Sequence, residues 1–176
     1  LTDARSGKDG RKRLVGRGNP ARTNQVMKIG VLALQGDFAE HIAMLKRLGA
    51  QGVEVRLPKH LDGLRGLIVP GGESTTIGKL AVAYDLMEPL RAFAKERAVW
   101  GTCAGAILLA SDVRDGRDDR PGLDVLDMTV RRNGFGRQLA SFEADLSLEL
   151  DPPLGGSSRA VFIRAPPIER VGPGIE

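Results

Sequence analysis

The single cysteine of the chain lies in a run of small residues, Gly101-Thr102-Cys103-Ala104-Gly105. The run has the form small-x-nucleophile-x-small and stands between a predicted strand and a predicted helix, as a nucleophile elbow requires. Such a sharp turn strains the backbone of the nucleophile, so a glycine or another small residue is needed on each side. A thiol at a helix N-terminus is also favoured as the thiolate. A lone cysteine is usually a buried structural residue, but the flanking glycines favour a nucleophile here.

An oxyanion formed by attack of Cys103 would need hydrogen-bond donors. The Ala104 N–H is one candidate, and the Gly71 backbone in a nearby loop is the other. The loop, Pro70-Gly71-Gly72-Glu73-Ser74, follows a predicted strand, and its glycines would let backbone amides approach a ligand closely. The alternative is a tight turn in which Ser74 caps the next helix, a role compatible with ligand binding.

Short apolar runs alternate with helical patterns from Met27 onward. The first strands are predicted at 28–34, 53–57, 67–70 and 98–100. Helical patterns are predicted at 38–49, 75–84, 89–97 and 104–110. The alternation predicts an α/β fold with a doubly wound, mostly parallel sheet and helices on both faces. Ligands of such folds bind beyond the carboxyl ends of the strands, where Gln35-Gly36, the 71–74 loop and the 101–105 turn are expected. A charged loop is predicted at 112–121, and further strands at 125–130, 142–148 and 160–164.

The charge of the chain is concentrated at one end. The 176 residues include 26 Lys and Arg against 22 Asp and Glu, and 41% are hydrophobic, which is enough for one domain. Seven of the basic and two of the acidic residues fall in residues 1–26, so the remainder is close to neutral and does not have the charge of a nucleic-acid-binding domain. We expect residues 1–26 to be a disordered basic extension. With one cysteine and no apolar run of membrane-spanning length, a cytoplasmic setting is expected.

Residues 27–176 resemble the glutaminase subunit of the two-component pyridoxal 5'-phosphate synthase, within the class I glutamine amidotransferases. The elbow alone would indicate only the wider amidotransferase group, whereas the other matching segments are far more specific. The matching segments are GVLALQGDFAEH (30–41), LIVPGGESTTIGKL (67–80), GTCAGAILLA (101–110), VRRNGFGRQLASFEADL (130–146) and VFIRAP (161–166).

The resemblance implies a flavodoxin-like glutaminase domain at 27–176, in which Cys103 takes the acyl group of L-glutamine and releases ammonia. It also implies a set of residues that hold the glutamine: Gly72, Glu73, Ser74, Arg132, Ile163 and Arg164. A zwitterionic amino acid needs fixed cationic and anionic partners, which fits the charged members of the set. Arg132 and Arg164 could instead be solvated, and Ile163 could be a core residue.

The partner that the resemblance implies is a synthase subunit, a (β/α)8 barrel that uses the ammonia to form pyridoxal 5'-phosphate, or vitamin B6. We expect no cofactor, no metal, no nucleic acid and no membrane. In that family the general base and its orienting acid lie in a His-x-Glu motif near the C-terminus. The sequence reaches Glu176 without such a motif, and its two histidines, His41 and His60, both precede Cys103.

We expect His41 and His60 to be solvated or partner-facing, and a chain without the base to be close to inactive. The interpretation we favour is that the protein continues beyond Glu176 with a segment that carries the catalytic His and Glu. Two alternatives stay open. One is the glutaminase subunit of another amidotransferase, such as that of histidine biosynthesis, which does not share the GGEST and FIRAP segments. The other is a catalytically dead docking partner.

Overall fold

The structure is a computed structural model, and it describes residues 26–116, 119–132, 141–147, 157–163 and 165–173. The predicted disordered extension at 1–26 lies outside the described residues, apart from Val26. No helix in the described ranges is long and apolar enough to cross a membrane. The elements, in chain order, are β1 (Lys28–Leu32), α1 (Phe38–Arg47), β2 (Gln51–Val55), the 3-10 helix η1 (Pro58–Leu61), β3 (Gly66–Val69), α2 (Ser74–Ala83), α3 (Met87–Glu96), β4 (Ala98–Gly101), α4 (Ala104–Leu109), β5 (Ala110–Arg114), β6 (Leu126–Arg131), β7 (Phe142–Ser147), β8 (Ser157–Phe162) and β9 (Ile168–Val171).

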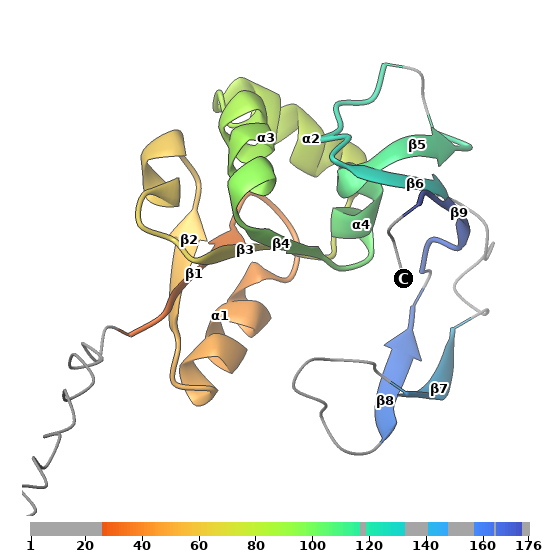
Figure 1. Cartoon of the computed structure of the whole chain (residues 1–176), viewed down its shortest axis with the longest axis horizontal. Coiled ribbons are helices and arrows are strands. Elements are labelled where there is room, and N and C mark those ends of the chain that lie inside the picture. The colour runs from red at the N-terminus through yellow and green to blue at the C-terminus, as the bar shows by residue number, and fades with distance from the viewer. Residues whose placement is uncertain (1–25, 117–118, 133–140, 148–156, 164, 174–176) are drawn as a thin grey trace, which may run out of the picture.

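A four-stranded parallel sheet with the order β2-β1-β3-β4 forms the centre of the fold. In this sheet Val31 of β1 lies opposite Glu54 of β2 on one side and Ile68 of β3 on the other. Parallel neighbours must be joined by crossover connections, and here helices supply two of them. The α1 crossover lies on one face of the sheet, and α2 and α3 lie on the other (Figure 1). This is the doubly wound arrangement that the alternating sequence pattern predicts.

The main hydrophobic core lies between this sheet and the helices α2, α3 and α4. Its fully buried members include Leu32 and Val69 from the strands and Ile77 and Leu90 from the helices. The helix α1 packs on the opposite face through half-buried side chains and has no fully buried residue. The helices on the α2 side therefore bury more apolar surface than α1, and the elements that carry the nucleophile turn belong to this larger core.

A second, smaller sheet has the order β5-β6-β9, with β5 parallel and β9 antiparallel to β6. The prediction of a loop from residue 112 was wrong for the first three residues, because β5 continues directly from α4. Three of the five side chains of this strand are polar: Asp112 accepts a hydrogen bond from Thr129 Oγ1 (3.0 Å), while Val113 packs against a small buried cluster. Its charged face gives it the composition of a loop. The strand β9 was not predicted at all.

A hairpin of β7 and β8 completes the described part of the fold. The two strands pair antiparallel, with Phe142 opposite Phe162, and the two rings stack with their centroids 4.6 Å apart. β7 agrees with the prediction at 142–148 over its described residues, whereas β8 begins three residues before the predicted strand at 160–164 and ends at Phe162. The end of β8 brings Phe162 and Ile163 to the wall of the large cavity described below.

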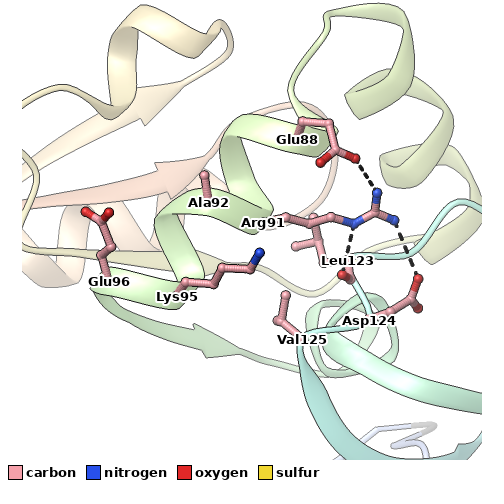
Figure 2. Close-up of a pocket in the computed structure, with 8 residues that line it drawn as sticks. All are labelled: Glu88, Arg91, Ala92, Lys95, Glu96, Leu123, Asp124 and Val125. Atoms are coloured by element: carbon pink, nitrogen blue, oxygen red, sulfur yellow. Dashed lines mark hydrogen bonds and ion pairs between the residues drawn. The ribbon is translucent and has the colours of Figure 1, made fainter.

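Arg91 of α3 ties the first sheet's helical layer to the segment that leads into the second sheet. Its guanidinium donates to the carbonyl oxygens of Leu123 (3.1 Å) and Gly122 (2.7 Å) and pairs with Glu88 (2.5 Å) and Asp124 (3.6 Å). Figure 2 shows this side chain reaching from the helix across a surface cavity of about 470 Å³. Since these contacts occupy both sides of the guanidinium, we interpret this cavity as a structural junction.

Leu90→Ala should lower the free energy of unfolding by about 2–5 kcal/mol, because it leaves a cavity in the main core. Leu90 is 1% exposed, whereas Leu48, at the end of α1, is 73% exposed and supplies a matched control. Leu48→Ala should change the same quantity by about 0.5 kcal/mol or less. Equilibrium urea unfolding followed by circular dichroism measures both, and equal losses would contradict this placement of the core.

Candidate active site

Cys103 lies at the turn between β4 and α4, and its backbone is in an unusual conformation. Its φ is +49° and its ψ is −105°, in a region that residues with a side chain rarely adopt. The side chain is nevertheless exposed. An exposed thiol on a strained strand-to-helix turn is the geometry that the sequence pattern predicts for a nucleophile elbow.

The flanking glycines are required by close packing. A Cβ on Gly105 would lie 2.0 Å from the carbonyl oxygen of Val69 in β3, and a Cβ on Gly101 would lie 2.6 Å from the backbone of Gly105. The same Val69 oxygen accepts a hydrogen bond from the Thr102 N–H (3.0 Å). The turn is therefore packed against β3 at Gly105 and against α4 at Gly101, which leaves no space for a side chain at either glycine.

A cavity of about 880 Å³ opens at the carboxyl ends of β1, β3 and β4. Its wall includes Gln35 and Asp37 from the segment that follows β1. The loop after β3 and the turn after β4 supply further wall residues. The described residues of the predicted site all line it: Gly71, Gly72, Glu73, Ser74, Cys103, Ala104, Arg132 and Ile163. The remaining predicted residue, Arg164, lies outside the described residues.

Glu73 and Arg132 form the charged pair of the cavity. The Arg132 guanidinium donates a hydrogen bond to Glu73, although the two residues are 59 positions apart in the sequence. Arg132 follows β6 in the second sheet and Glu73 follows β3 in the first. Ile163, for which a core position was the alternative, is 59% exposed in the same cavity. The site therefore combines a cation, an anion and an apolar surface beside the thiol.

Glu73 also caps α2, which corrects the alternative role considered for Ser74. The Glu73 carboxylate accepts hydrogen bonds from Thr75 N (3.3 Å), Thr76 N (2.7 Å) and Thr76 Oγ1 (2.8 Å). Ser74 is instead the buried first residue of the helix. Burial raises the pKa of Glu73, but the hydrogen bonds from Thr76 and Thr75 and the charge of Arg132 outweigh it, so its pKa is lowered.

The loops after β1 and β3 are joined by hydrogen bonds. The Gln35 side-chain oxygen accepts from Glu73 N (2.8 Å), and Asp37 N–H donates to the Gly71 carbonyl oxygen (3.2 Å). Gly36, at φ +95°, packs so closely that a Cβ there would lie 1.8 Å from the same oxygen. The Gly71 carbonyl oxygen therefore points toward the loop after β1.

Two further residues, at the start of α1, line the cavity although neither was predicted to be a site residue. They are Asp37, at the N-terminal end of the helix, and His41, one turn further on. His41 was expected to be solvated or partner-facing, but it is half-buried, with its ring edge-to-face against Trp100 (centroids 5.9 Å apart, interplanar angle 81°). The i, i+4 spacing in a helix that starts at the carboxyl edge of the sheet is the signal that could have found both.

No group of three or more His, Cys, Asp and Glu side chains in the described part of the chain is placed to hold a metal ion.

Comparison with known proteins assigns the family. Residues 31–176 match the SNO glutamine amidotransferase family. The chain belongs to this family. The chain is 58% identical over 151 residues to the pyridoxal 5'-phosphate synthase subunit PdxT of Roseiflexus castenholzii, covering 85% of this chain and 78% of that protein. It is 53% identical over 154 residues to the PdxT subunit of Chloroflexus aurantiacus, covering 85% and 79%.

A solved structure supports the same assignment for this SNO-family chain. A crystal structure of a glutamine amidotransferase, 53% identical in sequence, superposes with a TM-score of 0.76 over 84% of this chain and 77% of that one. The predicted α/β fold with a mostly parallel central sheet is thus confirmed, and so is the resemblance drawn from the sequence segments. The roles of the individual site residues stay predictions.

Acid unfolding should distinguish the parent chain from Glu73→Gln. Because the folded-state pKa of Glu73 is below the usual 4.5, its carboxylate stabilises the fold above that pH. This stabilisation is lost as the pH falls through the folded-state pKa. Between about pH 5 and pH 3 the free energy of unfolding should therefore fall less steeply in the variant. Urea titrations across this range measure the slope, and Glu96→Gln, which removes an exposed carboxylate of α3, is the control. Identical slopes for the parent and Glu73→Gln would show that the cap does not contribute.

Proposed function

We propose that this chain is the glutaminase subunit of a pyridoxal 5'-phosphate synthase. It hydrolyses L-glutamine to L-glutamate and ammonia and passes the ammonia to the synthase subunit. The observation that carries this proposal is the exposed Cys103 thiol, held at positive φ in a cavity that also contains the Glu73–Arg132 pair. The names of the similar PdxT proteins support the same function.

The chemistry begins with attack of the Cys103 Sγ on the side-chain amide carbon of glutamine. A carbon–sulfur bond forms, the carbonyl oxygen gains negative charge, and the Ala104 N–H and the Gly71 backbone are the proposed donors to that oxygen. The carbon–nitrogen bond then breaks, and the nitrogen leaves as ammonia after it takes up a proton. Water cleaves the resulting thioester, which releases glutamate and restores the thiol. The proton transfers need a general base, which in the resembled family belongs to the His-x-Glu motif.

The substrate's α-amino and α-carboxylate groups would be held at the Glu73–Arg132 end of the cavity. Arg132 offers a cation to the α-carboxylate, and Glu73 offers an anion to the α-ammonium group. Since Ile163 is exposed in the cavity, it can contact the aliphatic part of the substrate. Gly72, Ser74 and Arg164 complete the proposed set by family resemblance. This placement leaves the side-chain amide to reach toward Cys103.

The proposed partner is a synthase subunit with a (β/α)8 barrel that receives ammonia directly. A glutaminase that worked alone would release ammonia into water, so its activity should depend on docking. The Gly71 carbonyl now points to Asp37 N–H, and docking could reorient the Gly71–Gly72 peptide to complete the oxyanion site. One oxyanion donor contributes about 2.7–4 kcal/mol to the transition state.

A glutamine-analogue electrophile should label Cys103, the single cysteine of the sequence. Label should be absent from Cys103→Ala, and excess L-glutamine should slow the labelling of the parent chain because both bind the same cavity. Mass spectrometry of peptides from the labelled protein identifies the site. Label recovered on another residue, or a labelling rate that glutamine does not change, would contradict the proposal.

Glutamine hydrolysis should be faster with the synthase subunit than without it, by about a hundred-fold or more, which is the effect of one oxyanion donor. The measurement is ammonia release by a version of this subunit that carries the His-x-Glu motif. Cys103→Ala in that version is the control and should release no ammonia in either condition. Equal rates with and without the synthase subunit, and no complex in gel filtration, would leave a free-standing glutaminase.

A further inference from the structure

Asp37 occupies the N-cap position of α1 but does not cap the helix. An aspartate at this position usually accepts a hydrogen bond from a backbone N–H of the first turn. Here the Asp37 side chain makes no such bond, and its backbone φ of −85° and ψ of +41° lie outside the extended region usual for a cap. Among the residues that the structure describes, none donates a hydrogen bond to this carboxylate or forms an ion pair with it. The carboxylate instead lines the cavity that contains Cys103.

The Asp37 carboxylate lies at the Cys103 end of the cavity. Its Oδ2 is 3.7 Å from the point that a Cβ on Gly71 would occupy, and the Cβ of Cys103 is also 3.7 Å from that point. The two side chains therefore lie around the same glycine, close enough for one small chemical group to contact both. In a substrate of Cys103, that group would be the one that the thiol attacks.

The other carboxylate of the described cavity wall is already occupied. Glu73 accepts hydrogen bonds from Thr75, Thr76 and Arg132, so its charge is compensated before any ligand arrives. Asp37 and Glu73 thus differ in their position in the cavity and in their hydrogen-bond partners. Glu73 belongs to the charged pair, whereas Asp37 is an exposed carboxylate beside the nucleophile that accepts no hydrogen bond from a described residue.

We propose that Asp37 determines the specificity for a carboxamide over a carboxylate at the reacting end of the substrate. This inference rests on the proposed glutaminase function. The –NH2 of glutamine can donate a hydrogen bond to the Asp37 carboxylate, which is a charge-assisted contact. The side-chain carboxylate of glutamate has no proton to donate at neutral pH and carries the same charge as Asp37. The repulsion therefore acts against glutamate, which is also the product that must leave.

The test compares the binding of L-glutamine and L-glutamate by isothermal titration calorimetry in a Cys103→Ala background, where no turnover occurs. In this background the ratio of the glutamate Kd to the glutamine Kd should fall by about three- to tenfold on Asp37→Asn. Because the Asp37 side chain makes no cap hydrogen bond, and asparagine is as favourable as aspartate at this position, the variant should fold like its parent. Asp37→Glu keeps the charge and should keep most of the discrimination.

The control is Asp85→Asn, which makes the same change of charge in the turn between α2 and α3, where the residue is exposed and does not line the cavity. Its ratio of Kd values should equal that of the background. If glutamine binds and the ratio is the same with Asp37→Asn as with Asp85→Asn, the inference about Asp37 is overturned while the glutaminase function stands. If the background binds no glutamine at all, the proposed function fails and this inference fails with it.

Discussion

The contact on which the site depends is the approach of the β4–α4 turn to the carbonyl oxygen of Val69. That oxygen accepts the Thr102 N–H and lies where a side chain on Gly105 would have to be. Val69 is fully buried and ends β3, so the strand that fixes the nucleophile turn also leads into the 71–74 loop. β3 therefore sets the distance between the Cys103 thiol and the backbone of the 71–74 loop. The strained conformation of Cys103 is maintained because the surrounding core is packed around it.

The hydrogen bonds around Glu73 extend this arrangement from the backbone to the substrate side of the cavity. The Glu73 carboxylate caps α2 and accepts a hydrogen bond from Arg132, and the backbone N–H of Glu73 donates to the side-chain oxygen of Gln35. Three segments far apart in the sequence thus meet at one residue. A change in the position of any of them would be transmitted to the others through these hydrogen bonds. This gives a physical reason why the loop after β1 belongs to the site although it supplies neither the thiol nor the charged pair.

The sequence alone was sufficient for the central sheet and the nucleophile turn, because both leave a local pattern. A continuous apolar run such as residues 28–34 predicts a buried strand, and glycines on each side of a cysteine predict a tight turn. β5 could not be predicted in this way, since Asp112 and its neighbours resemble a loop until Thr129 is seen to pair with them. The role of Asp37 was also hidden, because an aspartate before a helix normally indicates a cap. Its departure from that role is visible only in the structure, where its side chain makes no cap hydrogen bond.

The pairing of Arg132 with Glu73 has a consequence for the electrostatics of ligand binding. The two charges compensate each other before a ligand arrives, and a zwitterionic amino acid brings no net charge. Little long-range attraction or counterion exchange is then involved when such a ligand enters. The contact of the α-amino and α-carboxylate groups with this pair should therefore depend only weakly on ionic strength.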